Sequence, residues 1–175
     1  MALETAEYAG PERREQIAFD DKQLMRVLAT VETSFVATVD PTGQPDVSHK
    51  GGPAGFLNYH PSARQLRWIE LIGNGTFRSA GNVRATGWIS VVALDLATGD
   101  AYELSGQGQY ETRLRYDAPR ESGLWSAEED FPVQGVMTVD VREVARLRRL
   151  IAPRRRLEAV EKITSCSPVQ DQVPR

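Results

Sequence analysis

The sequence has little of the material from which several common kinds of site are built. Its 175 residues include one cysteine, Cys166, so no disulfide forms within the chain. The two histidines, His49 and His60, belong to no Cys/His cluster and no HExxH pattern, which leaves a zinc site without support. The longest apolar runs are far shorter than a membrane span, and no apolar signal core follows the N-terminus. We therefore expect a cytoplasmic protein with no membrane association.

The chain also lacks an excess of basic residues. Lys and Arg number 21 against 24 Asp and Glu, which gives a net charge of −3, and the pI is near 5.5. Because nucleic-acid binding usually needs a basic face, nucleic acid is not an expected partner. No GxGxxG motif follows a predicted strand, so a Rossmann dinucleotide site is disfavoured.

The length and composition are those of one globular domain with irregular ends. Hydrophobic residues make up 41% of the chain and charged residues 26%, both within the usual range. We assign residues 1–19 to a polar N-terminal arm, 20–145 to the domain and 146–175 to a polar C-terminal tail. The tail is rich in arginine, and it is either a solvated segment or an arm that crosses to a partner subunit.

Apolar spacing predicts one helix at the start of the domain, followed by two hairpins. Spacings of three and four residues over 20–31, with an aspartate able to cap the first turn, indicate an amphipathic helix. Turn residues separate the extended stretches 34–40 and 46–50, and a second turn-like run separates 55–59 from 66–71.

A second helix and three further strands complete the predicted domain. We expect a short helix over 76–84, capped by Thr76, and paired strands over 88–96 and 101–110. The strand 88–96 is apolar in both phases and is predicted to be buried on both sides, which assigns Trp88, like Trp68, to the core. A half-exposed strand over 133–144 follows a loop with a helical turn near 121–128. This pattern favours a β-barrel or sandwich over a parallel sheet.

Two short segments combine features that suit an anionic ligand. Residues 48–52 bring together a hydroxyl, a cation and two glycines at a strand end, which lets the backbone approach an anion. Residues 73–79 form a glycine-rich turn that leads into the short helix, where free backbone N–H groups and the helix dipole favour a phosphate. The two segments could hold one phosphate between them. The alternative is that neither binds a ligand, and that they are a polar turn and the capped start of a helix with no further role.

Together these segments resemble the pyridoxamine 5'-phosphate oxidase-like flavin-binding proteins. The similar stretches are FVATVD at 35–40, GQPDVSHKGGPAGF at 43–56, GN at 73–74, FRSAGN at 77–82 and LDLATG at 94–99. The resemblance covers roughly residues 20–145. It implies a mainly β fold, an antiparallel split β-barrel of the FMN-binding type, in a homodimer that binds flavin mononucleotide (FMN) in clefts between the subunits.

The resemblance also implies which residues contact the cofactor. Lys50, Arg78 and Ser79 correspond to the residues that grip the phosphate. The residues expected along the isoalloxazine ring are Leu71, Ile72 and Asn74, and those expected to make further polar contacts are Ser48 and Asn82.

The chain departs from the true oxidases in two respects. Position 79 is serine where they have a second basic residue, and the tail has no counterpart of their substrate-binding arginine and histidine.

The reaction itself stays open at this stage. The resemblance favours an FMN-dependent oxidoreductase with an unknown small-molecule substrate, but no residue pattern nominates a catalytic residue. The alternatives are a flavin storage, carrier or sensor protein without turnover, and a relative that binds a deazaflavin or haem, the latter through His49. Trp125 could cover a flavin bound by the other subunit.

Overall fold

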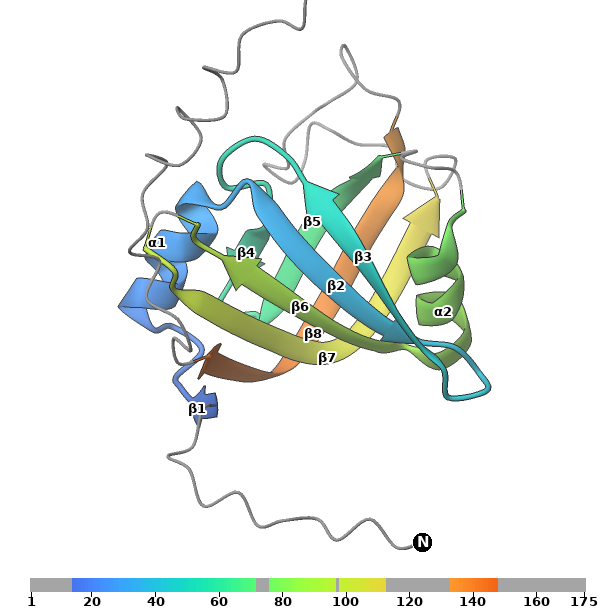
Figure 1. The fold of residues 1–175 in the computed structure, drawn as a ribbon, viewed down its shortest axis with the longest axis horizontal. Helices are drawn as coiled ribbons and strands as arrows, with labels where there is room; N and C mark the ends of the chain where they lie inside the picture. Colours follow the sequence, from blue (N-terminus) through green and yellow to red (C-terminus); the bar gives the residue numbers. More distant parts are fainter. Residues whose placement is uncertain (1–13, 72–75, 97, 113–132, 148–175) are drawn as a thin grey trace, which may run out of the picture.

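The computed structural model describes residues 14–71, 76–96, 98–112 and 133–147 (Figure 1). The expected helical turn near 121–128, Trp125, Cys166 and residues 148–175 of the arginine-rich tail lie outside the described residues. The described elements follow one another in the order β1 (Arg14–Gln16), α1 (Lys22–Thr30), β2 (Thr33–Val39), β3 (Pro45–Gly51), β4 (Asn58–His60), β5 (Gln65–Leu71), α2 (Arg78–Thr86), β6 (Trp88–Leu94), β7 (Ala101–Thr112) and β8 (Val133–Leu147).

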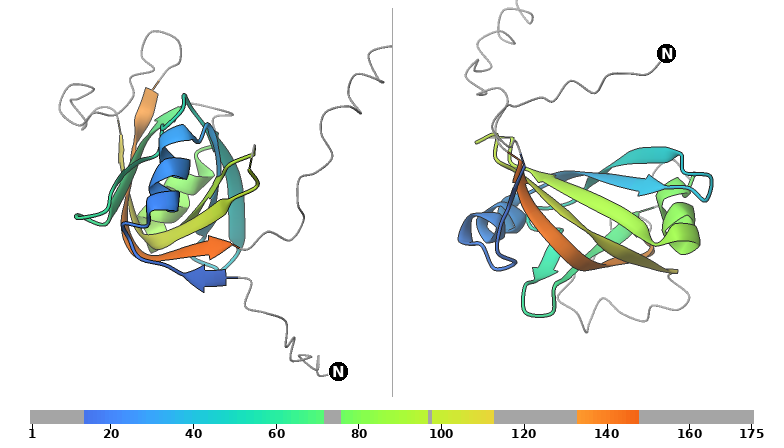
Figure 2. Two further views of the ribbon diagram at one scale, coloured as in Figure 1. Left: turned by 90° about the vertical axis from the view of Figure 1, so that its left-hand side faces the viewer. Right: turned by 90° about the horizontal axis from the view of Figure 1, so that it is seen from below.

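All described strands belong to one antiparallel sheet with the order β3-β2-β6-β7-β8-β5-β4, and β1 adds to β8. The sheet curls into a barrel that stays open between its two ends (Figure 2). Helices α1 and α2 lie at opposite ends of this barrel (Figure 1). The expected antiparallel split barrel is therefore confirmed, as are the two hairpins and the pairing of β6 with β7. Neither described helix has the length and apolar character that a membrane crossing requires.

Helix α1 forms where the apolar spacing predicted it. The Asp21 carboxylate accepts hydrogen bonds from the backbone N–H groups of Gln23 and Leu24, at 2.9 and 3.0 Å, and so caps the first turn. Leu24, Val27 and Leu28 are buried against the barrel. The helix ends because Val31 adopts an extended conformation that leads into β2.

The core fills the barrel with the inward side chains of the alternating strands. Strand β8 buries Met137, Val139 and Val141 while Asp140 and Arg142 face solvent, as its period-two pattern predicts. Trp68 on β5 is the largest fully buried side chain among the described residues. Its predicted place in the core is confirmed.

The predicted burial of Trp88 is wrong. Strand β6 buries Ile89, Val91 and Ala93 on one face only, and Trp88 at its start is 56% exposed. The opposite phase of the strand faces outward, so an apolar residue there is not evidence of a second buried face. Leu96, which we placed on the same strand, lies beyond its end and is 71% exposed.

The ends of the domain differ slightly from the expected limits. Strand β1 lies within residues 1–19, which we expected to be an arm, and it pairs with the end of β8. Arg14 anchors it through ion pairs with Glu103 and Glu143 on the outer face of the sheet. Strand β8 itself continues to Leu147, past the expected boundary at residue 145.

Two glycines offer a matched test of how closely the strands pack. A Cβ atom on Gly106, at the bulge of β7, would overlap the carbonyl oxygen of Asp140 and lie 2.9 Å from the carbonyl carbon. Gly81→Ala provides the control, since a Cβ on this helical residue meets nothing within 4 Å. We expect Gly106→Ala to lower the free energy of unfolding by about 2 kcal/mol or more, and Gly81→Ala to raise it by about 0.5–1 kcal/mol. Urea denaturation measures both, and equal effects would contradict the packing described.

Candidate functional site

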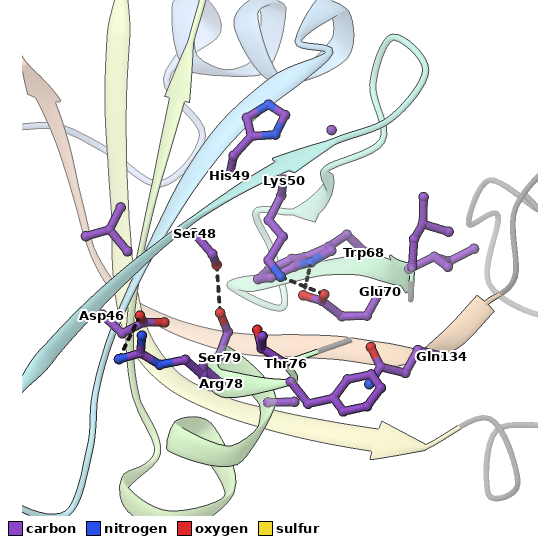
Figure 3. A pocket seen from close by; sticks show the side chains of 16 residues that line it. Asp46, Ser48, His49, Lys50, Trp68, Glu70, Thr76, Arg78, Ser79 and Gln134 are labelled. Carbon is purple, nitrogen blue, oxygen red and sulfur yellow. Dashed lines mark hydrogen bonds and ion pairs between the residues drawn. The ribbon is translucent and has the colours of Figure 1, made fainter. Parts of the chain in front are cut away.

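A cleft of about 620 Å³ opens between β3, β5 and the start of α2 (Figure 3). This size is typical of small-molecule sites. Its walls are residues 46–51, 68–71, 76–80 and Gln134. The cleft therefore contains residues of both segments that the sequence singled out, 48–51 at the end of the second strand and 76–79 at the start of the short helix.

Strand β3 points every second side chain toward the cleft. Asp46, Ser48 and Lys50 share the less exposed face of the strand, whereas Val47 and His49 lie on its exposed face. The His49 ring packs edge-on against Phe35 of β2, 5.8 Å away between ring centroids. Figure 3 shows His49 turned away from the side chains that meet across the cleft.

A buried ion pair forms the inner part of the cleft. Lys50 Nζ lies 2.8 Å from Glu70 Oε2 on β5, and Trp68 Nε1 donates to Glu70 Oε1 at 2.8 Å. The Glu70 side chain is 6% exposed and that of Lys50 is 18% exposed. Both carboxylate oxygens of Glu70 thus have a donor, as a buried charge requires.

This pair crosses the opening of the barrel. Strand β3 is one end of the strand order, and β5 is next to the other end, so no backbone ladder connects them. The Lys50–Glu70 contact joins them through side chains instead. It therefore fixes the distance between two walls of the cleft that the sheet alone leaves free.

The start of α2 forms the third wall. Phe77 precedes the helix in the left-handed region, with φ 52°, and its own side chain makes no capping hydrogen bond. The helix begins later than predicted, at Arg78, so Phe77 and not Thr76 occupies the N-cap position. Arg78 Nη2 lies 3.2 Å from Asp46 Oδ1, and Ser79 Oγ lies 2.7 Å from Ser48 Oγ. These contacts attach the first turn of α2 to β3.

The structure brings five of the eight predicted site residues to this cleft: Ser48, Lys50, Leu71, Arg78 and Ser79. Asn82, one turn further along α2, instead donates from Nδ2 to Thr38 Oγ1 at 3.0 Å and does not line the cleft. Ile72 and Asn74 lie outside the described residues. The contacts of all eight with a cofactor stay predictions.

Sequence reasoning missed the two carboxylates of the cleft, Asp46 and Glu70. Leu66, Trp68 and Glu70 occupy the same phase of β5 and all are buried. A charged residue in the inward phase of a strand was therefore the available signal, since such a residue needs a buried partner. The described residues contain no group of three or more His, Cys, Asp or Glu side chains placed to bind a metal ion.

Tyr110 on β7 provides a further polar group within the electrostatic influence of Glu70. Its hydroxyl is buried and has no hydrogen-bond partner within the described part of the chain, and Arg84 of α2 lies 5.0 Å above its ring. Burial, with a smaller contribution from the negative charge of Glu70, raises the pKa of Tyr110 above its usual value of 10.0, against the lowering effect of Arg84. The hydroxyl is thus held in its neutral form.

Comparison with known proteins finds similarity in structure. No protein-family model matches the chain, and a search of curated proteins finds no match. Among solved structures, tagged HupZ of Group A Streptococcus has a TM-score of 0.55 and 22% identity, over 73% of this chain and 94% of that one. A Clostridium acetobutylicum protein related to general stress protein 26, of the pyridoxinephosphate oxidase family, has a TM-score of 0.52 and 12% identity, over 74% and 88%. A pyridoxamine 5'-phosphate oxidase-related, FMN-binding protein of Nostoc punctiforme has a TM-score of 0.50 and 14% identity, over 73% and 83%.

These likenesses define the fold class of the chain. It has the split-barrel fold of structures that include proteins named as pyridoxamine 5'-phosphate oxidase-related and FMN-binding. This is the class of structure that the sequence resemblance implied. At these identities the similarity establishes the fold alone.

The buried ion pair predicts an asymmetry between the two cations of the cleft. Lys50→Met leaves the buried Glu70 without its partner and is expected to lower the free energy of unfolding by about 3–5 kcal/mol. Arg78→Met is the control, because the Arg78 side chain is 66% exposed and its pair contributes at most about 1 kcal/mol. The double variant Lys50→Met/Glu70→Gln should recover much of the loss. Equal losses for the two single variants in urea denaturation would contradict a buried pair.

Tyr110 predicts a pH dependence at the alkaline end. Because its pKa is raised in the folded protein, folding favours the protonated phenol, and this contribution to stability is lost as pH rises through the folded-state pKa, above 10.0. We expect the stability of the wild type to fall more steeply above about pH 10 than that of Tyr110→Phe. At pH 7 the variant should differ by less than about 0.5 kcal/mol, since the hydroxyl has no hydrogen bond to lose among the described residues. Denaturation curves at several pH values measure this, and parallel curves for the two proteins would contradict it.

Proposed function

We propose that this protein is an FMN-binding flavoprotein, and that it acts as an oxidoreductase on a small-molecule substrate. One observation carries the proposal: in a split-barrel fold, Ser48, Lys50, Arg78 and Ser79 meet in one cleft at the first turn of a helix. Hydroxyl, ammonium, guanidinium and free backbone N–H groups are the donors that a phosphate requires. The Nostoc structure named as FMN-binding supports this choice of cofactor.

The residues present fit a flavin in placement and in kind. The phosphate would lie at the start of α2, near Ser79 and Arg78, and Leu71 offers an apolar surface for the ring. Bound flavin would supply the acceptance and donation of a hydride or of electrons. The chain's own contribution is to bind the phosphate, to orient the ring and to limit the access of water.

We further propose that two copies of the chain form a homodimer. The outer face of β3, β2 and β6 exposes Val47 at 65%, Phe35 at 42% and Trp88 at 56%. These residues share the outward phase of three adjacent strands, so they form an apolar surface larger than a single exposed side chain. A second copy that covers this surface would lie next to the cleft, because β3 lines both.

A specific observation favours flavin binding without turnover as the second candidate. Among the described residues, each charged side chain that points into the cleft has an ion-pair partner there, Lys50 with Glu70 and Arg78 with Asp46. No described acid or base is therefore free to transfer a proton to a substrate. Haem binding through His49 is less favoured, since the His49 ring packs on the opposite face of β3 from Lys50.

Absorbance spectroscopy tests the cofactor. We expect purified protein incubated with FMN and then freed of excess ligand to keep the flavin bands, and Lys50→Ala to weaken binding by about tenfold or more, because the unpaired Glu70 carboxylate would repel the phosphate. Arg142→Ala, on an exposed part of β8, is the control and should bind normally. A wild type that retains no FMN would contradict the proposal, and the same titration with a deazaflavin or haem would then identify the ligand.

Two further measurements on the same samples test the homodimer and the oxidoreductase activity. Light scattering should give twice the 19.4 kDa mass of the chain if the protein is a homodimer. Bleaching of the flavin bands by a nicotinamide donor, followed by reoxidation by an acceptor, would favour the oxidoreductase. Retention of oxidised flavin under all donors would favour a carrier or sensor.

A further inference from the structure

The charges that line the cleft balance one another. Its walls carry the carboxylates of Asp46 and Glu70 and the cationic groups of Lys50 and Arg78, whose formal charges sum to zero. Each cation lies against one carboxylate, at 2.8 Å for Lys50–Glu70 and 3.2 Å for Arg78–Asp46. These side chains therefore offer no net positive charge to a phosphate that enters the cleft. A site that binds phosphate strongly has a net positive charge.

The inner pair has little freedom to separate. Glu70 is almost fully buried, and its second oxygen is held by the Trp68 indole N–H. If Lys50 left Glu70 for a phosphate, it would abandon a buried carboxylate, which is strongly unfavourable. Lys50 can offer a phosphate its remaining N–H groups, but Glu70 has already neutralised its charge.

The outer pair acts differently because its members differ in exposure. The Arg78 side chain is 66% exposed, whereas that of Asp46 is 13% exposed and belongs to the inward phase of β3. Arg78 can exchange its partner for solvent or a ligand, but Asp46 stays at the cleft. Its negative charge then opposes any anion that lies beside Arg78.

Neutral donors occupy the space between the two pairs. The hydroxyls of Ser48 and Ser79 lie 2.7 Å apart, and Ser79 is 5% exposed. A hydroxyl can donate to a ligand hydroxyl as well as to a phosphate oxygen. This part of the cleft thus binds polar groups without requiring negative charge.

We infer that Asp46 and Glu70 are specificity-determining residues that set the charge of the ligand accepted by the cleft. They act as internal counter-ions to Arg78 and Lys50, so the cleft binds a flavin with weak preference for its phosphorylated form. The inference rests on the proposed function in that the ligand is a flavin. It goes beyond that proposal because it assigns roles to two carboxylates and a ligand preference to the cleft.

Riboflavin and FMN make a matched pair of probes because they differ by the phosphate alone. In the wild type we expect the two dissociation constants to differ by less than about tenfold, and Asp46→Asn or Glu70→Gln to raise the preference for FMN by about tenfold. The riboflavin constant itself should change little. Asp140→Asn, which removes a carboxylate from an exposed position of β8, is the matched control and should leave the preference as in the wild type.

The variants are designed so that misfolding does not hide the result. Glu70→Gln keeps the shape of the side chain but leaves Lys50 unpaired in the inner cleft, whereas Asp46→Asn alters only the outer pair and tests the inference by itself. Adding Lys50→Gln to Glu70→Gln should abolish the gained preference. An unchanged preference in folded Asp46→Asn and Glu70→Gln, while flavins still bind, would overturn the inference and leave the proposed function standing.

A titration with inorganic phosphate separates this inference from the identity of the ligand. Phosphate should raise the melting temperature of Asp46→Asn and Glu70→Gln more than that of the wild type or Asp140→Asn, because it neutralises the cation that each substitution leaves unpaired. If the wild type binds neither flavin, the proposed function fails, and this phosphate difference then supports the counter-ion role. Equal shifts in all four proteins would overturn it.

Discussion

The Lys50–Glu70 ion pair is the contact on which the geometry of the cleft depends. An open barrel has two free ends, and here β3 stands at one end while β5 stands one strand from the other. Backbone hydrogen bonds determine the distance between adjacent strands of the sheet, but they do not determine the distance between β3 and β5 across the opening. Because Glu70 is buried and both of its oxygens have donors, the pair is held in one arrangement and sets that distance.

The same logic extends along β3, whose inward residues each reach an opposing wall. Asp46 contacts Arg78, Ser48 contacts Ser79 and Lys50 contacts Glu70, so successive inward positions tie the strand first to α2 and then to β5. The period of two in the strand places all three on one side. Three cross-contacts therefore bound the cleft, and Arg78 at one end is exposed whereas Ser79 and Glu70 are buried.

The sequence predicted those parts of the molecule that depend on local spacing. Helix α1, the hairpins and the alternation of β8 follow from periodicity, and the resemblance placed Lys50, Ser79 and the start of α2 near one another. Trp88 was misassigned because β6 is apolar in both phases, which hides the inward face. The partners of Lys50 and Arg78 were missed because the approach of β3 to β5 and to α2 is a tertiary property. The start of α2 was predicted two residues too early, because Phe77, not Thr76, occupies the N-cap position with left-handed backbone geometry.

Because side-chain contacts hold the cleft together, a ligand must replace some of them, and the free-energy cost differs from one contact to another. Replacing the Ser48–Ser79 contact exchanges one neutral hydrogen bond for others, which changes the free energy little. Replacing the Lys50–Glu70 contact leaves a buried carboxylate without its counter-ion, which is strongly unfavourable. A ligand therefore gains most by entering at the hydroxyls and the first turn of α2 while the ion pair stays intact. The inner pair thus serves as the fixed floor of the cleft, and the hydroxyls and the helix start serve as its adaptable wall.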